Sequence, residues 1–174
     1  GDLVFFLDSD DYFKKLNISY IVKLYLNNPN KKFFFDLPII LDKNNRNYAV
    51  IKKKFFKRNW SYIHPTSCIS IKKNFLNKIF KLIYVNKFSD IWMDFRINIC
   101  VRYIFKDFCL VNKNLTFYRK TNNSVSSNFK FLSVNWWRRR LQAHHYVFFF
   151  LKKNKLPIRK NLDFYLTKII NLFL

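Results

Sequence analysis

The sequence is short of the residues that break or cross-link chains. Its 174 residues include one glycine, four prolines and three cysteines. Collagen-like and linker-like chains are therefore excluded, and an odd number of cysteines without a CxxC pair argues against a disulfide framework or a structural zinc site. No apolar run reaches the ~18 residues that a membrane-spanning helix needs. With no visible signal peptide, we expect a cytoplasmic protein with reduced thiols.

Acidic residues are also scarce. Ten Asp and Glu stand against 33 Lys and Arg, which gives a formal net charge of +23. A field of this sign favours anionic partners such as nucleotides, nucleic acid or acidic lipid. Lysine is spread along the whole chain, so much of this charge is expected to solvate the surface. Half of the residues are hydrophobic, including 22 Phe and 10 Tyr, which is enough for the core of one domain.

Hydrophobic periodicity predicts an α/β protein, with strands and helices alternating first and helices at the end. Strands are predicted over residues 2–7, 32–41, 48–56, 67–71, 108–111 and 115–119. The first of these is expected to be a buried strand of a parallel sheet. Helical spacing predicts helices over residues 12–28, 72–80, 90–105, 131–153 and 161–174. Polar turns or loops are predicted over residues 42–47 and 121–128.

Three of the ten acidic residues, Asp8, Asp10 and Asp11, directly follow the first predicted strand. Carboxylates within ~4 Å of each other repel by ~1–4 kcal/mol per pair, and a divalent cation offsets this repulsion. Carboxylate oxygens suit Mg²⁺ or Mn²⁺, and ligands of open α/β sheets bind at the carboxyl ends of strands. We therefore expect Asp8 and Asp10 to bind a metal that carries a diphosphate. The alternative is that Asp10 or Asp11 caps the helix predicted after Tyr12.

The opening segment GDLVFFLDSDD, from Gly1 to Asp11, resembles the central part of family 2 glycosyltransferases of the GT-A fold. In that family an apolar strand ends in a DxD motif that binds the metal and the diphosphate of a sugar nucleotide. Three later strings are similar to the family's acceptor-site strand, the helix that carries its ED pair and its YR…SVS loop, in the same order. They are HPTSCISI from His64, FSDIWMDFR from Phe88 and YRKTNNSVS from Tyr118.

This resemblance implies a partial GT-A fold, which is Rossmann-like with a mixed sheet, flanking helices and a C-terminal helical tail. Residues 1–130 would be the C-terminal half of the catalytic domain, and residues 131–174 a helical extension. The sequence departs from the family in two ways: Met93 replaces the Glu of the ED pair, and the half that binds the nucleoside is missing before Gly1. We therefore expect residues 1–174 to be inactive by themselves.

The resemblance assigns the role of the base, and the charges of other residues suggest further roles. Asp94 would be the base that takes the proton of the acceptor hydroxyl in an inverting transfer. Asp90, on the same predicted helix face, is the alternative base, or it favours the helix N-terminus instead; for Asp94 the alternative is a salt bridge with a nearby Arg or Lys. Arg119 or Arg138 would bind the departing diphosphate, and Asp11 would assist Asp8 and Asp10.

The densest aromatic and basic cluster, WWRRR, runs from Trp136 to Arg140. Trp137 is predicted in the core, and Trp136 is either a platform for a sugar or part of a solvated basic face. One of His144 and His145 is expected in the core, with a metal or phosphate contact as the alternative. His64 is expected at a plain turn, or else at the acceptor site.

The sequence thus predicts a metal-dependent glycosyltransferase that uses Mg²⁺ or Mn²⁺, a nucleotide-sugar donor and a glycan or lipid-linked acceptor, as in cell-surface polysaccharide synthesis. The first alternative is a basic nucleic-acid-binding module, against which the diffuse charge and the absence of a binding motif argue. The second is a peripheral membrane protein with residues 156–174 as an interfacial anchor. That alternative is compatible with sugar transfer at the inner face of a membrane.

Overall fold

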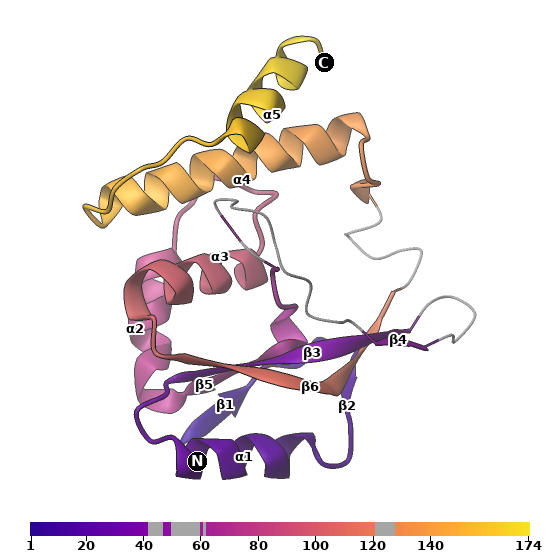
Figure 1. Cartoon of the computed structure of the whole chain (residues 1–174), viewed down its shortest axis with the longest axis vertical. Helices are drawn as coiled ribbons and strands as arrows, with labels where there is room; N and C mark the ends of the chain where they lie inside the picture. Colours follow the sequence, from indigo (N-terminus) through magenta and orange to yellow (C-terminus); the bar gives the residue numbers. More distant parts are fainter. Residues whose placement is uncertain (42–46, 50–59, 61, 121–127) are drawn as a thin grey trace. The chain divides into compact units, whose positions relative to one another are not determined.

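A computed structural model describes residues 1–41, 47–49, 60, 62–120 and 128–174 (Figure 1). The chain forms two compact units, and each is described by itself. The first unit contains Gly1–Lys54, Ile63–Tyr84 and Met93–Thr121. The second contains Phe55–Tyr62, Val85–Trp92 and Asn122–Leu174, and so includes the predicted helical extension.

The first unit is built on a six-stranded mixed sheet with the order β1-β5-β3-β6-β2, in which β4 also pairs with β3. The strands are β1 (Leu3–Phe5), β2 (Tyr12–Phe13), β3 (Phe33–Leu41), β4 (Asn47–Ala49), β5 (Ile69–Lys72) and β6 (Phe108–Arg119). The β3–β6 pair is parallel and the other pairs are antiparallel. The predicted α/β class with a mixed sheet is confirmed. The prediction for the first strand was wrong, because β1 is a half-buried edge strand, antiparallel to β5.

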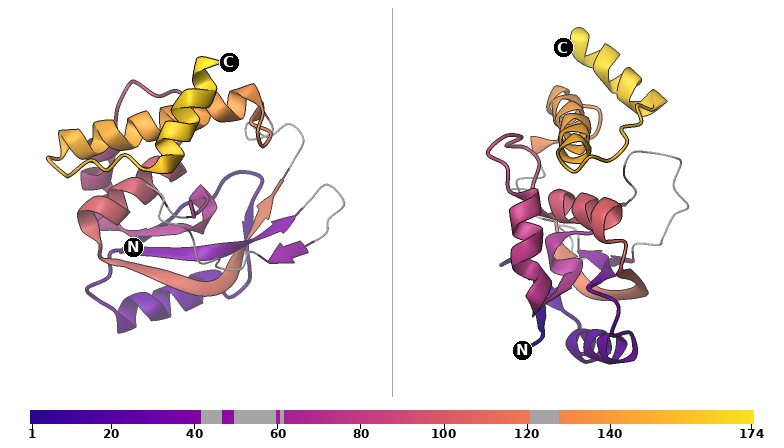
Figure 2. Two further views of the ribbon diagram at one scale, coloured as in Figure 1. Left: turned by 45° about the horizontal axis from the view of Figure 1, so that its top comes forward. Right: turned by 90° about the vertical axis from the view of Figure 1, so that its left-hand side faces the viewer.

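The central strand β3 has the predicted bounds to within one residue. Its side chains alternate between the two faces of the sheet. Phe34 packs with Ile21 of helix α1 (Asn17–Asn27), whereas Phe33 contacts Phe75 of helix α2 (Lys73–Ile83). Figures 1 and 2 accordingly show α1 and α2 on opposite sides of the sheet. The sheet is therefore covered on both faces, which explains why almost every residue of β3 is buried.

Strand β6 runs without a break through the polar residues Asn112 to Asn114, so the prediction of two separate strands was wrong. The pairing of β3 with β6 shifts register on both sides of Leu37. Next to this shift lies Pro38, which cannot donate a ladder hydrogen bond; its carbonyl accepts one from Asn114 Nδ2 at 3.0 Å instead. The register shift allows β6 to continue through these polar residues. Bulges of this kind often lie beside functional sites.

Two predicted helices begin later than expected. The helix predicted from Tyr12 is α1, because Tyr12 and Phe13 form β2 and pair with β6. Its N-cap position is Leu16, without a side-chain cap, so neither Asp10 nor Asp11 caps it. The helix predicted from Asp90 is α3 (Met93–Cys100), which continues as a π-helical turn over Val101–Phe105. The strand predicted over 67–71 begins as a 3₁₀ turn (Thr66–Cys68) before β5.

The second unit contains the two predicted C-terminal helices, α4 (Val134–Lys153) and α5 (Leu162–Leu172), with ends within three residues of the prediction. Ser133 and Asn161 cap them, since their side chains accept hydrogen bonds from Trp136 N and Phe164 N. Helices α4 and α5 are in contact, and in both views of Figure 2 α5 crosses α4 at an angle. Within the described part of the chain, no helix has the length and apolarity needed to cross a bilayer.

Some predictions concern residues that lie outside the described ones. The predicted turn over 42–47 is described only at Asn47, which begins β4. The strand predicted over 48–56 is described only at its first two residues, also in β4. The loop predicted over 121–128 is described only at Asn128.

The packing of α1 against the sheet gives a direct test of the fold. Ile21→Ala leaves a cavity beside Phe34 and is expected to lower the free energy of unfolding by about 2–4 kcal/mol. Ile18→Ala, on the exposed side of the same helix, should change it by less than about 0.5 kcal/mol. Urea unfolding followed by circular dichroism measures both, and equal effects would contradict this placement of α1.

Candidate functional site

The acidic segment after β1 crosses the sheet from one edge to the other. Phe6 N donates to Ile69 O of β5 at 3.2 Å, and Asp8 N donates to Ser67 Oγ at 3.0 Å. At the far side, Asp11 is joined to β6, and the chain enters β2 at the opposite edge. The carboxylates therefore lie at the carboxyl end of β1, where ligands of α/β sheets commonly bind.

Asp11 anchors this segment. Its side chain is 7% exposed, Oδ2 accepts a 2.6 Å hydrogen bond from Ser67 Oγ, and Oδ1 accepts a 2.9 Å bond from Arg119 N. Burial raises the pKa of Asp11, although both hydrogen bonds favour its charged form. Because each oxygen of Asp11 is bound by the protein, Asp11 positions the loop, and Asp8 and Asp10 are the carboxylates of this segment that could hold a cofactor.

Asp8 and Asp10 are exposed. Burial raises the pKa of the Asp8 carboxyl, and the negative charge of Asp10 raises it further, so the two carboxylates repel each other. Among the described residues, no group of three His, Cys, Asp or Glu could hold a metal ion. Two exposed carboxylates nevertheless fit Mg²⁺ or Mn²⁺ that completes its shell with phosphate and water. The pair therefore suits a metal–diphosphate complex better than a bare ion.

A buried polar network lies beneath the acidic segment and was not predicted. Asp36 of β3 is 4% exposed, and its Oδ2 accepts from Thr116 Oγ1 of β6 at 2.8 Å. Asn17, at the start of α1, donates to Thr116 Oγ1 at 3.2 Å and to Leu115 O at 3.0 Å. Burial raises the pKa of Asp36 to about 6. The available signal was a single acidic residue inside the apolar run FFFDLPII.

His64 connects this network to the helix that carries Asp94. His64 Nδ1 lies 2.7 Å from Asp36 O, and Asn98 Nδ2 donates to both His64 O (3.0 Å) and Asp94 O (2.8 Å). Asp94 is in the first turn of α3, where its Oδ1 accepts from Phe95 N at 2.7 Å. The buried His64 thus occupies a bridging position between β3 and α3, which neither expectation for this residue described.

Asp90 does not share a helix face with Asp94, because α3 begins after it. It lies in a turn of the second unit, where Oδ2 accepts from Gln142 Nε2 at 3.0 Å and its carbonyl accepts from Arg139 Nε at 2.9 Å. These hydrogen bonds indicate that Asp90 attaches its turn to helix α4. Asp94 belongs to the first unit, together with Asp8 and Asp10.

The two candidate arginines also belong to different units. Arg119 ends β6, is exposed, and its backbone N–H binds Asp11. Arg138 is on α4, where its Nη2 donates to Leu174 O at 3.3 Å. The first unit therefore brings Arg119 to the acidic segment.

The WWRRR cluster packs internally within the second unit. The Arg139 guanidinium lies 3.7 Å from the ring centre of Trp92, and Arg140 pairs with Asp163 and lies 5.0 Å from the ring centre of Trp136. Trp137 is half-buried, so the prediction that it is a core residue was wrong. These contacts do not match a plain solvated basic face.

The two adjacent histidines of α4 differ in burial, as predicted. His144 is fully buried and its Nε2 lies 3.4 Å from Asp163 Oδ2, whereas His145 is exposed. Burial lowers the pKa of His144 to about 4. The core role predicted for one of the pair is therefore confirmed for His144.

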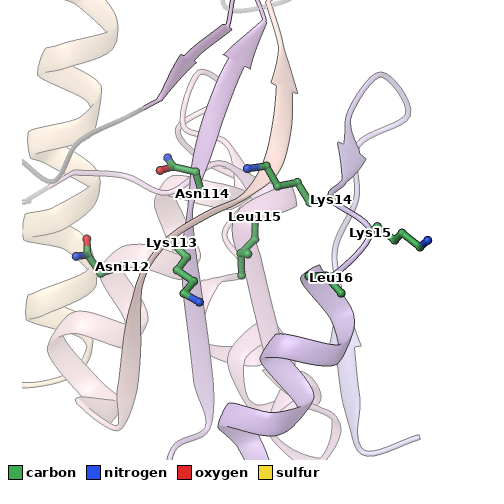
Figure 3. A pocket seen from close by; sticks show the side chains of 7 residues that line it. All are labelled: Lys14, Lys15, Leu16, Asn112, Lys113, Asn114 and Leu115. Carbon is green, nitrogen blue, oxygen red and sulfur yellow. The ribbon is translucent and has the colours of Figure 1, made fainter.

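A surface pocket of about 620 Å³ lies elsewhere in the first unit (Figure 3). Its lining consists of Lys14, Lys15, Leu16, Asn112, Lys113, Asn114 and Leu115. None of the predicted site residues lines it, and the ammonium groups of its three lysines point in different directions. This pocket therefore does not form a focused anion site and is separate from the acidic segment.

A scan against models of protein families and a search of curated proteins find no match to this chain. The resemblance to glycosyltransferases therefore depends on the sequence motifs alone.

The anchoring role of Asp11 predicts a contrast between neighbouring aspartates. Asp11→Ala leaves Ser67 Oγ and Arg119 N without their acceptor and should lower the free energy of unfolding by about 2–3 kcal/mol. Asp10→Ala removes an exposed side chain and should change it by less than about 0.5 kcal/mol. Urea unfolding of both variants measures the difference, and a larger loss for Asp10→Ala would refute the assignment.

Asp36 predicts a pH dependence of stability. Its pKa rises from 3.8 to about 6 on folding, so the native state binds this proton more tightly than the unfolded state does. The contribution of Asp36 to stability should therefore fall by ~3 kcal/mol as pH rises from about 4 to 6, and level off above that. His144, whose pKa is lowered to about 4, contributes the opposite slope over an overlapping range.

The slope that belongs to Asp36 is isolated by comparing the wild type with Asp36→Asn. The amide cannot ionise, so the difference in unfolding free energy between the two proteins should change by ~3 kcal/mol across this pH range. Urea unfolding at a series of pH values measures it. A difference that stays constant with pH would show that Asp36 does not titrate in this way.

Proposed function

We propose that this chain is the C-terminal part of a metal-dependent, inverting glycosyltransferase of GT-A type. The observation that carries the proposal is the arrangement of the acidic segment. Asp11 is buried and bound at both oxygens, while Asp8 and Asp10 are exposed and repel each other at the carboxyl end of β1. A loop anchored in this way holds two carboxylates toward a ligand without using them to stabilise the fold.

The remaining residues of the first unit suit the same reaction. Mg²⁺ or Mn²⁺ held by Asp8 and Asp10 would neutralise charge on the departing nucleoside diphosphate. Arg119, whose backbone N–H binds Asp11, would stabilise the same charge electrostatically with its side chain. Asp94 would accept the proton of the acceptor hydroxyl as its oxygen bonds to the anomeric carbon and the bond from that carbon to the diphosphate breaks.

On this proposal, a nucleoside-binding half would join the sheet at the edge strand β1. Strand β1 pairs with β5 along one side, and its residues Leu3 to Phe5 are half-buried. A strand added along the other side would extend the sheet and satisfy the exposed backbone groups. We therefore propose that sugar transfer needs residues upstream of Gly1. Residues 1–174 by themselves would still bind a metal and a diphosphate through Asp8 and Asp10, without transferring a sugar.

Nucleic-acid binding is the weaker candidate. The net charge of +23 favours it, but two arginines of the WWRRR cluster, whose side chains could otherwise contact phosphates and bases, have partners inside the second unit. Arg139 stacks on Trp92, and Arg140 pairs with Asp163. Base stacking and phosphate contacts would have to break these interactions first.

Binding of a metal and a diphosphate by Asp8 and Asp10 can be tested on residues 1–174. Mn²⁺ together with inorganic pyrophosphate should raise the melting temperature, because a ligand that binds the native state stabilises it. Asp10→Ala should abolish the rise, whereas Asp2→Ala, which removes an exposed carboxylate at the start of the same strand region, should keep it. A rise that survives Asp10→Ala would refute the metal site.

A variant of Asp94 can distinguish ligand binding from catalysis in a longer protein that contains this chain. Asp94→Asn should abolish sugar transfer, since the amide cannot take the acceptor proton, and leave the response to Mn²⁺ and pyrophosphate intact. Binding of RNA that weakens with salt and is unaffected by Asp10→Ala would favour the nucleic-acid module instead.

A further inference from the structure

Helix α5 has two chemically different faces. One face is turned to α4: Phe164 and Thr167 are buried, and Asn171 Nδ2 donates to Trp137 O at 3.1 Å. The other face is apolar and exposed. It consists of Leu162, Tyr165, Leu166, Ile169, Leu172 and Phe173, which are between 50% and 85% exposed.

The spacing of these exposed side chains is that of a single helical stripe. Steps of three and four residues from Leu162 to Phe173 keep them on one side of α5. Scattered exposed leucines are ordinary on protein surfaces, but a continuous stripe indicates a surface that another apolar phase covers. We call this set of six side chains the α5 stripe.

Basic side chains surround the α5 stripe in the sequence. Residues 129–174 contain ten Lys and Arg and one acidic residue, Asp163. Asp163 is already paired with Arg140. Arg159 and Lys160 precede α5, Lys168 lies within it, and all three are exposed. An apolar stripe bordered by uncompensated positive charge fits a partner that is both apolar and anionic.

These features favour an anionic lipid bilayer over other occupants. A second copy of the chain would carry the same charge, so two α5 faces would repel each other as they approached. Nucleic acid would use the basic residues and leave the α5 stripe in water. We propose that α5 lies in the interface of an anionic membrane, with the α5 stripe among the acyl chains and the flanking Lys and Arg on the headgroups.

This proposal concerns the second unit and does not depend on sugar transfer, since it uses no residue of the acidic segment. It is compatible with a lipid-linked acceptor.

Vesicle co-flotation of residues 1–174 tests the surface. We expect binding to vesicles of phosphatidylcholine mixed with phosphatidylglycerol, weaker binding at high salt, and little binding to phosphatidylcholine alone. Leu166→Glu/Ile169→Glu should weaken binding to the anionic vesicles by about tenfold or more. The matched control is Leu26→Glu/Ile18→Glu, which places the same charges at exposed Leu and Ile positions of α1 and should lose far less.

Two further measurements separate lipid insertion from adsorption by charge and from dimerisation. Tyr165→Trp should show additional fluorescence quenching by brominated lipids if the α5 stripe enters the acyl region. Circular dichroism should show both double variants folded, because the replaced side chains are exposed. Equal losses for the two double variants would mean that net charge alone drives adsorption, and would overturn the proposal. A dimer in sedimentation that Leu166→Glu/Ile169→Glu dissociates would overturn it in favour of a second copy.

Discussion

The carboxylate of Asp11 is the interaction on which the acidic segment depends. It accepts hydrogen bonds from Ser67 before β5 and from the backbone of Arg119 at the end of β6, and so ties together segments that are far apart in the sequence. Charge-assisted bonds of this kind are among the stronger ones in proteins. Because the third aspartate is held inside, the first two are left at the surface, and the repulsion between Asp8 and Asp10 is compensated by no partner that the structure describes at those side chains.

The buried polar network of the first unit is also held together by hydrogen bonds between segments that are distant in the sequence. Thr116 lies between Asp36 and Asn17, while His64 lies between Asp36 and Asn98. A buried polar group costs free energy unless it is hydrogen-bonded, so these partners constrain one another to a single arrangement. The network connects β3, β6, α1 and α3, and it reaches the turn that carries Asp94. The network thus links Asp94, through the interior of the first unit, to strands β3 and β6, and this link supports the proposal that Asp94 and the acidic segment form one site.

Sequence patterns predicted the parts of the molecule that local physics decides. Strand β3 and helices α4 and α5 were placed correctly, because a long apolar run and helical spacing with Ser133 and Asn161 as caps are local signals. Strand β1 was placed wrongly in a parallel sheet, since its partner β5 is distant in the sequence and pairing cannot be read from one strand. Asp90 was placed on α3 because i,i+4 spacing assumes a helix start that the structure puts at Met93. Asp8, Asp10 and Arg119 were found from motifs, but Asp36 required the knowledge that β3 crosses beneath the acidic segment.

The scarcity of acidic residues also bears on how a metal would reach Asp8 and Asp10. A chain with a net charge of +23 repels a free divalent cation at long range, while the attraction of two carboxylates is screened beyond a Debye length of ~8 Å at physiological salt. The diphosphate of a nucleotide sugar carries net negative charge and would be drawn in by the same field, whereas its complex with a divalent cation is close to neutral. On the proposed function, the long-range charge would favour arrival of the sugar nucleotide, and the two local carboxylates would then bind a cation on its diphosphate. On this proposal the positive charge of the chain and the acidic segment would act in sequence on one ligand, and two carboxylates would suffice because the phosphates and water would complete the shell of the metal.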